Sequence, residues 1–263
     1  MIKLIVSDMD GTLLDEFGNI PEEFWEVAEE LKKENIIFAV ASGRQYYTLL
    51  KQFEKIKDDI IFIAENGTYV MYHDKELFLN PLPSDDAKFV LKKIEDIKNT
   101  QVVFCGKKSA YIKKGDLLFE KEVRKYYIKL ETVNNLSEVK DDICKIALCN
   151  FEGSEKFIYP YVKHLENRYK VVVSGDIWLD IEKLDANKGS ALSIIQKKLG
   201  ISYNESMAFG DYLNDIELMP LCKYSFAMEN AHEDLKKICK FRAKSNMDNG
   251  VIEIIKKFCL EYN

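Results

Sequence analysis

The sequence predicts an α/β protein with a doubly wound, Rossmann-like parallel-sheet core and an inserted, smaller α+β domain. In the first 70 residues, near-continuous apolar segments typical of strands buried on both faces alternate with segments of helical period. That alternation indicates a parallel sheet covered by helices on both sides. From about residue 83 the pattern changes to shorter strands joined by hairpin turns, and the alternation resumes near residue 186.

The first third supplies three strands and two helices of the predicted core. The helix after the Gly18 turn is typical, because Phe24, Val27, Ala28 and Leu31 form an apolar stripe, with glutamates in its first turn and lysines in its last. The predicted strands are 2–7, 36–42 and 60–66, and the predicted helices are 21–35 and 45–53.

The middle of the chain predicts an antiparallel sheet with helices on one face. Helices are expected at 86–99 and 116–130, short strands around 102–106, 109–114 and 145–151, and a hairpin that turns at Ser174–Asp176. We assign 83–185 to the inserted domain and 1–82 with 186–263 to the core.

The last third continues the core. The predicted elements are a helix at 188–200 stopped by Gly200, a strand at 206–210, a helix after Asn214, a strand at 224–228 and a closing helix at 251–258.

Composition excludes several classes of function. The net charge is −6, from 38 basic and 44 acidic residues, which argues against the basic face that a nucleic-acid partner requires. No apolar run reaches the roughly 18 residues of a membrane span, and Ser7 and Asp8 interrupt any signal-peptide pattern. Six cysteines without a CxxC pair favour reduced thiols in a cytoplasmic protein.

Two carboxylates follow the first predicted strand, in the segment DMDGT. Side chains at i and i+2 of a strand point the same way, so Asp8 and Asp10 are expected on one side of the edge where open α/β sheets bind ligands. A divalent cation such as Mg²⁺ would offset their repulsion. Gly11 and Thr12 form a turn whose N–H groups could face an anion. Asp-Gly is also a common solvated turn, and the motif alone does not decide between these interpretations.

Three further motifs occupy equivalent places. Ser42-Gly43-Arg44 follows the second core strand, where a hydroxyl and a flexible backbone suit a phosphate oxygen. Lys188-Gly189 opens a helix, where a lysine opposes the macrodipole unless an anion binds there.

The last motif is GDYLND. It places Asp211 at another strand end and, if the next turn is helical, Asn214 and Asp215 on the same face. Each motif alone has an ordinary structural explanation, as a cap, a turn or a solvated lysine. All four in this order, each at a strand end or helix start, favour a functional site.

The order DMDGT, SGR, Lys188-Gly189 and GDYLND resembles the four motifs of the haloacid dehalogenase superfamily of phosphohydrolases. An insertion between the second and third motifs is similar to the Cof-like branch (type IIB), whose large cap domain lies there. The segments ENGTYV (65–70) and AMENA (227–231) also resemble that branch.

The resemblance implies a Mg²⁺-dependent phosphatase with Asp8 as nucleophile and Asp10 as general acid and base. It implies metal binding by the Asp8 carboxylate, the Asp10 backbone carbonyl and the Asp211 carboxylate. It implies that Asp215 and Arg44 support the phosphoryl-binding residues without contacting the phosphoryl group. The residues that it implies for phosphoryl binding are Met9, Thr12, Ser42, Gly43, Lys188 and Asn214.

The expected partner is a small phosphorylated metabolite, with sugar phosphates first and flavin-pathway or pyridoxal phosphates as alternatives. Two other functions stay open: a phosphomutase or phosphotransferase with the same nucleophile, and a metal- and phosphate-binding regulator that has lost turnover. A requirement for a bisphosphate would indicate the mutase. The presence of Asp10 beside Asp8 argues against the regulator, since pure binding does not need a second carboxylate.

Overall fold

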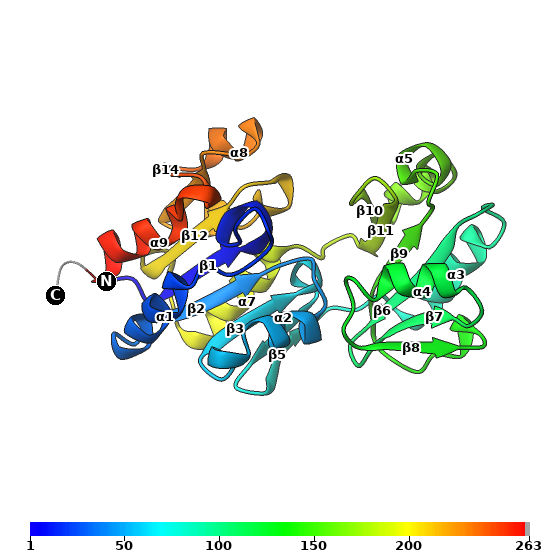
Figure 1. Ribbon diagram of the computed structural model, residues 1–263, viewed down its shortest axis with the longest axis horizontal. Helices are drawn as coiled ribbons and strands as arrows, with labels where there is room; N and C mark the ends of the chain where they lie inside the picture. Colours follow the sequence, from blue (N-terminus) through cyan, green and yellow to red (C-terminus); the bar gives the residue numbers. More distant parts are fainter. Residues whose placement is uncertain (261–263) are drawn as a thin grey trace. The chain divides into compact units, whose positions relative to one another are not determined.

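The computed structural model describes residues 1–260, which form two compact units (Figure 1). Unit 1 comprises Met1–Gly43, Leu49–Leu79 and the segment from Asn187 to the C-terminal end. Unit 2 comprises Arg44–Thr48 and Asn80–Ala186. The predicted insertion limits, 83 and 185, lie inside unit 2, whereas the short Arg44–Thr48 segment of that unit was not foreseen.

Unit 1 is built on an eight-stranded sheet in the order β14-β13-β12-β1-β2-β3-β4-β5. All neighbouring strands from β14 to β3 run parallel, and β4 and β5 extend the sheet as an antiparallel hairpin. The strands are β1 (Leu4–Asp8), β2 (Ile37–Ala41), β3 (Ile60–Ala64), β4 (Tyr69–Tyr72), β5 (Lys75–Leu79), β12 (Ser206–Gly210), β13 (Tyr224–Met228) and β14 (Phe241–Ala243).

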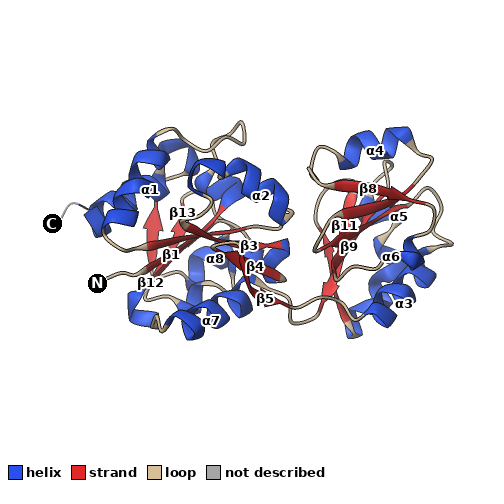
Figure 2. Ribbon diagram, turned by 90° about the horizontal axis from the view of Figure 1, so that it is seen from below, coloured by secondary structure: helices blue, strands red, loops and turns tan. Residues whose placement is uncertain are grey.

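Helices cover both faces of this sheet, with α1 and α2 on one side and α7 on the other (Figure 2). The α1 stripe of Phe24, Val27, Ala28 and Leu31 is buried as the sequence predicts, and α1 packs against α9. The helices of unit 1 are α1 (Glu23–Lys33), α2 (Tyr46–Gln52, which begins in unit 2), α7 (Lys188–Leu199), α8 (Glu233–Ile238) and α9 (Gly250–Ile255).

The strand order reverses next to β1. From β1 the chain adds β2 and β3 on one side, and after unit 2 it adds β12, β13 and β14 on the other. In open α/β sheets the carboxyl ends of the strands at such a switch point flank a ligand-binding crevice. The ends of β1 and β12, Asp8 and Gly210, are therefore the expected location of a site.

Unit 2 contains a six-stranded sheet in the order β10-β11-β9-β6-β7-β8. Its strands are β6 (Gln101–Gly106), β7 (Ala110–Lys113), β8 (Leu130–Val133), β9 (Ile143–Cys149), β10 (Tyr169–Val173) and β11 (Trp178–Lys183). Its helices are α3 (Ser84–Ile94), α4 (Leu117–Val123), α5 (Ser154–Phe157) and α6 (Tyr159–Val162). The predicted hairpin turn joins β10 to β11, which pair antiparallel.

Three predictions for this unit were wrong. Helices lie on both faces of the sheet rather than one, because Phe104 faces a core that includes α3 and α6, whereas Val103 faces a second core that includes α4 (Figure 2). The sheet is also not wholly antiparallel, since β7 and β8 run parallel. The helix predicted over 116–130 ends at Val123, and the chain from there leads into β8.

The core helix predicted after Asn214, in the GDYLND motif, is also absent as an α-helix. Single 3₁₀ turns at Leu213–Asp215 and Met219–Leu221 stand in its place. By contrast, α7 ends as predicted, because Gly200 adopts the left-handed conformation at its C-cap.

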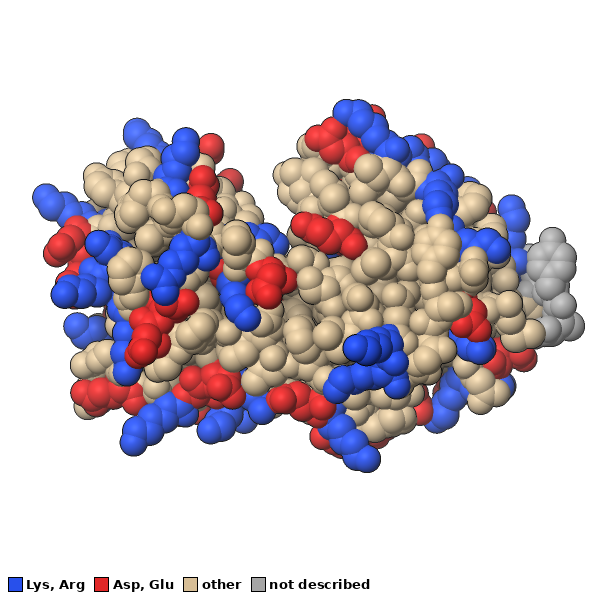
Figure 3. Space-filling model, turned by 180° about the vertical axis from the view of Figure 1, so that it is seen from behind, with Lys and Arg blue, Asp and Glu red and all other residues tan. Residues whose placement is uncertain are grey.

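Within residues 1–260, no helix has the length and apolar character needed to cross a bilayer. On the face that Figure 3 shows, lysine and arginine side chains are interspersed with aspartate and glutamate.

Candidate active site

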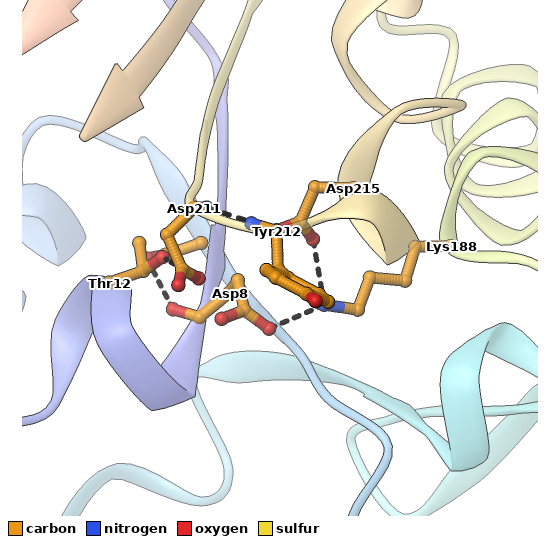
Figure 4. A network of polar contacts seen from close by, with 7 residues as sticks. Asp8, Thr12, Lys188, Asp211, Tyr212 and Asp215 are labelled. Carbon is orange, nitrogen blue, oxygen red and sulfur yellow. Dashed lines mark hydrogen bonds and ion pairs between the residues drawn. The ribbon is translucent and has the colours of Figure 1, made fainter. Parts of the chain in front are cut away.

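Lys188 joins the two halves of the core at the switch point. Its side chain is fully buried, and its Nζ donates to Asp8 Oδ1 and, at 2.7 Å, to Asp215 Oδ1 (Figure 4). Asp8 ends β1 and Lys188 is the first residue of α7, so residues 180 positions apart in the sequence are in direct contact. The sequence predicts these two residues at one edge but not that the lysine is buried between two carboxylates.

Asp215 belongs to a turn that closes back on the end of β12. Its Oδ2 accepts hydrogen bonds from the backbone N–H groups of Asp211, at 3.1 Å, and Tyr212, at 3.3 Å. A carboxylate that caps its own turn in this way is fixed in direction. The predicted proximity of Asp215 to Asp211 therefore arises from a capping turn rather than from a shared helix face.

Asp211 faces the turn that follows β1. Thr12 Oγ1 donates to Asp211 Oδ1 at 3.0 Å. Gly11, with a φ of +77°, passes so close that a methyl group there would lie 2.3 Å from Asp211 Oδ2. The glycine of the first motif is thus required both by its left-handed backbone and by the carboxylate beside it.

The carboxylates of Asp8, Asp211 and Asp215 form an acidic cluster, in which one oxygen from each lies within 4.8 Å of the others. Burial raises the pKa of Asp8 well above its ordinary value, although Lys188 acts in the opposite direction. Burial and the charge of Asp215 raise the pKa of Asp211 to about 6. Burial lowers the pKa of Lys188, but the charges of Asp215 and Asp8 outweigh it and raise that pKa overall.

This cluster fits a hard divalent cation. Three carboxylates and one ammonium leave a net charge of −2 in a mostly buried place, and carboxylate oxygens are the ligands that Mg²⁺ takes in proteins. Asp211 and Asp8 are the members suited to ligation, because both carboxylate oxygens of Asp215 already accept hydrogen bonds, Oδ1 from Lys188 and Oδ2 from two backbone N–H groups.

The other predicted residues of the first motif lie in the turn Met9–Leu13, in which Asp10 and Gly11 have non-helical backbone angles. Met9 and Thr12 are buried, whereas Asp10 is exposed.

The second motif follows β2, the strand next to β1 in the sheet. Ser42 is buried, and its backbone N–H donates to Ile63 O at 2.9 Å, which fixes the loop to the end of β3. Gly43 and Arg44 are half-buried, and Arg44 is the first residue of unit 2. Asn214 is half-buried in the turn that carries Asp215.

One residue near the site was missed by sequence reasoning about single side chains. Asn230, in the AMENA segment after β13, donates from Nδ2 to Gly11 O at 2.7 Å and so holds the turn that carries the first motif. The resemblance of AMENA to the family marked the segment but gave no role for this asparagine.

The family of haloacid dehalogenase-like hydrolases matches residues 5–255. The chain belongs to this family. The predictions of a haloacid dehalogenase family member, a Rossmann-like α/β fold and a hydrolase are thereby confirmed.

Individual relatives match over nearly the whole chain. The 5-amino-6-(5-phospho-D-ribitylamino)uracil phosphatase YbjI of Escherichia coli K12 is 36% identical over 262 residues, which are 97% of this chain and 96% of that protein. A solved structure from Streptococcus mutans UA159 is 30% identical, with a TM-score of 0.85 and coverage of 98% of this chain and 99% of that one. The subclass IIB sugar phosphatase BT4131 shares the fold at 20% identity, with a TM-score of 0.78 and coverage of 97% and 98%.

Proposed function

We propose that this chain is a Mg²⁺-dependent phosphatase that hydrolyses small phosphomonoesters through an aspartyl-phosphate on Asp8. The observation that carries the proposal is the buried Lys188, which bridges Asp8 and Asp215 beside the carboxylate of Asp211. A carboxylate nucleophile and a phosphate dianion repel each other, so their reaction needs fixed positive charge at the meeting point. This arrangement supplies one cation and the ligands for another.

The reaction has two steps. An Asp8 carboxylate oxygen attacks phosphorus, the bond from phosphorus to the ester oxygen breaks, and Asp10 gives its proton to the departing alkoxide. Asp10, now a carboxylate, then takes a proton from water as that water attacks phosphorus. The bond from phosphorus to Asp8 breaks, and inorganic phosphate leaves. One carboxyl group acts first as acid and then as base, which requires that it reach solvent.

The metal would be held by the Asp8 and Asp211 carboxylates and by the Asp10 backbone carbonyl. When bound, Mg²⁺ supplies charge neutralisation between the nucleophile and the phosphoryl group. Thr12 supports Asp211 through its hydroxyl, and Asp215 orients Lys188.

The phosphoryl oxygens would be held at the ends of β1 and β2 and at the start of α7. We assign this role to the Met9 N–H, Thr12, Ser42, Gly43, the Lys188 ammonium and the Asn214 side chain. We assign Arg44, the residue after Gly43 in the chain, a supporting role without contact to the phosphoryl oxygens.

The first substrate to examine is a phosphorylated polyol joined to a nitrogen heterocycle. The basis is the 36% identity, over nearly the full length, to a relative named for 5-amino-6-(5-phospho-D-ribitylamino)uracil. Sugar phosphates are the second class. We propose that unit 2 serves as the cap domain that recognises the part of the substrate beyond the phosphoryl group.

The proposal is tested by phosphate release from a panel of esters that includes this pyrimidine, ribose 5-phosphate, glucose 6-phosphate and pyridoxal phosphate. We expect release from at least one ester with Mg²⁺ present, and loss of that release with EDTA. Release that persists unchanged in EDTA would contradict the metal requirement. If the phosphoryl group is instead found on a second hydroxyl of the sugar, and only when a bisphosphate is added, the result would indicate the mutase.

A further inference from the structure

The turn that follows β3 has an unusual backbone. Its three consecutive residues, Glu65, Asn66 and Gly67, have φ angles of +48°, +55° and +96°. Asparagine and glycine tolerate the left-handed region, but a glutamate there is uncommon, and Glu65 is also 2% exposed. Such a conformation persists only where the surrounding structure holds it, and it occurs preferentially at functional sites.

On one side this turn contacts the second motif. The backbone N–H of Asn66 donates to Ser42 O at 3.0 Å. Gly43 lies so near the Asn66 side chain that a methyl group on Gly43 would be 3.0 Å from Asn66 Oδ1. Asn66 therefore sets the position of the Ser42–Gly43 backbone by direct contact.

On the other side the turn contacts the start of α7. A methyl group on Gly67 would lie 2.3 Å from Asn187 O and 3.0 Å from Lys188 N. These are backbone atoms, which cannot move aside like the end of a flexible side chain. Asn187 is also the N-cap of α7, because its Oδ1 accepts from Ser190 N at 2.7 Å. The bare backbone of Gly67 therefore allows the first turn of α7 to approach this close.

We infer that Glu65–Gly67 is a positioning turn for the phosphate site, which holds the Ser42–Gly43 loop and Lys188 at a fixed separation. The inference rests on the proposed function, because it takes these residues as the groups that hold the phosphoryl oxygens. The turn lies between both of them and contacts each through backbone atoms. It acts through its neighbours, without a contact to the reacting atoms.

Gly67→Ala tests this inference, with Gly200→Ala as the matched control. Gly200 also has a positive φ, +65°, and caps the opposite end of α7, but a methyl group there would meet no heavy atom within 4 Å among residues 1–260 other than those of its own chain neighbours and of the adjoining helix backbone. Both variants carry the strain of alanine in a left-handed conformation. Only Gly67→Ala must displace the backbone beside Lys188.

We expect kcat to fall about 100-fold in Gly67→Ala, the size of effect that a misplacement of about 1 Å can produce, with the affinity for inorganic phosphate at least about 10-fold weaker. Gly200→Ala should match the wild type in both. The Mg²⁺ concentration that gives half-maximal activity should not change in Gly200→Ala, and in Gly67→Ala it should change less than the affinity for phosphate, since Asp211 accepts a hydrogen bond from Thr12 of the turn after β1.

Asn66→Gly is the second variant, because it keeps the left-handed backbone and removes only the side chain beside Gly43. We expect a weaker affinity for inorganic phosphate in an otherwise stable protein. Equal kcat and equal phosphate affinity in Gly67→Ala and Gly200→Ala would overturn the inference. Absence of phosphate release by the wild type itself would instead contradict the proposed function, and equilibrium binding of inorganic phosphate would then still test the turn.

Discussion

Replacement of Asp8 by Asn is expected to reduce phosphate release by at least about 10⁴-fold, because an amide cannot act as the nucleophile that forms the acyl phosphate. The stability of the fold should not decrease. Asp8 belongs to a cluster of three carboxylates and one ammonium, and a neutral side chain reduces the net charge of that cluster from −2 to −1. Thermal unfolding without metal should therefore occur at the wild-type temperature or above it.

The control for this substitution is Asp59→Asn. Asp59 pairs with Lys32 on the surface of unit 1, and its loss should leave phosphate release unchanged. If Asp8→Asn releases phosphate at a rate within tenfold of the wild type, Asp8 is not the nucleophile.

Replacement of Lys188 by Met is expected to reduce both activity and stability. The ammonium is fully buried and paired with two carboxylates, so its removal leaves Asp8 and Asp215 without their shared cation. Breaking a buried ion pair from one side typically costs about 3–5 kcal/mol, and we expect a loss of that order in metal-free unfolding experiments with denaturant. Phosphate release should fall by about 10²–10³-fold, as for the loss of one fixed charge at the transition state.

The double variant Asp8→Asn/Lys188→Met separates charge from packing. It removes one anion and one cation, so the cluster keeps the wild-type charge of −2 instead of the −3 of Lys188→Met. We expect the double variant to unfold at a higher denaturant concentration than Lys188→Met alone. If the two unfold together, the instability of the single variant comes from lost packing and not from unpaired carboxylates.

The position of the candidate site could be predicted from the sequence because parallel strands end at a common edge. Asp8 and Asp211 each follow an apolar run, so a doubly wound sheet brings them together whatever the details of its turns. The start of α7 was equally predictable, since Lys188 and Gly200 bound a helical pattern. Both predictions depend on the periodicity of apolar residues and on the direction of the strands, which can be inferred from the local sequence.

Other features depend on tertiary contacts that no local pattern expresses. The sequence pattern indicates that the segment of α4 is a helix, but it does not indicate which face of the sheet that helix packs against. The prediction that all helices of unit 2 lie on one face was wrong for that reason. The turn after β12 was predicted as helical, although Asp215 instead caps the backbone of Asp211 and forms a 3₁₀ turn. The left-handed Glu65 could not be foreseen, because glutamate does not favour that conformation.

The formation of a covalent bond between Asp8 and phosphorus is the central claim, and mass spectrometry of acid-quenched Asp10→Asn protein tests it most directly. With p-nitrophenyl phosphate, whose leaving group needs no protonation, the first step should proceed without the acid, whereas hydrolysis of the intermediate lacks its base. We predict one phosphoryl group per chain, on the peptide that contains Asp8. Release of p-nitrophenol with no phosphoryl group on that peptide, or with one on another residue, would contradict the account.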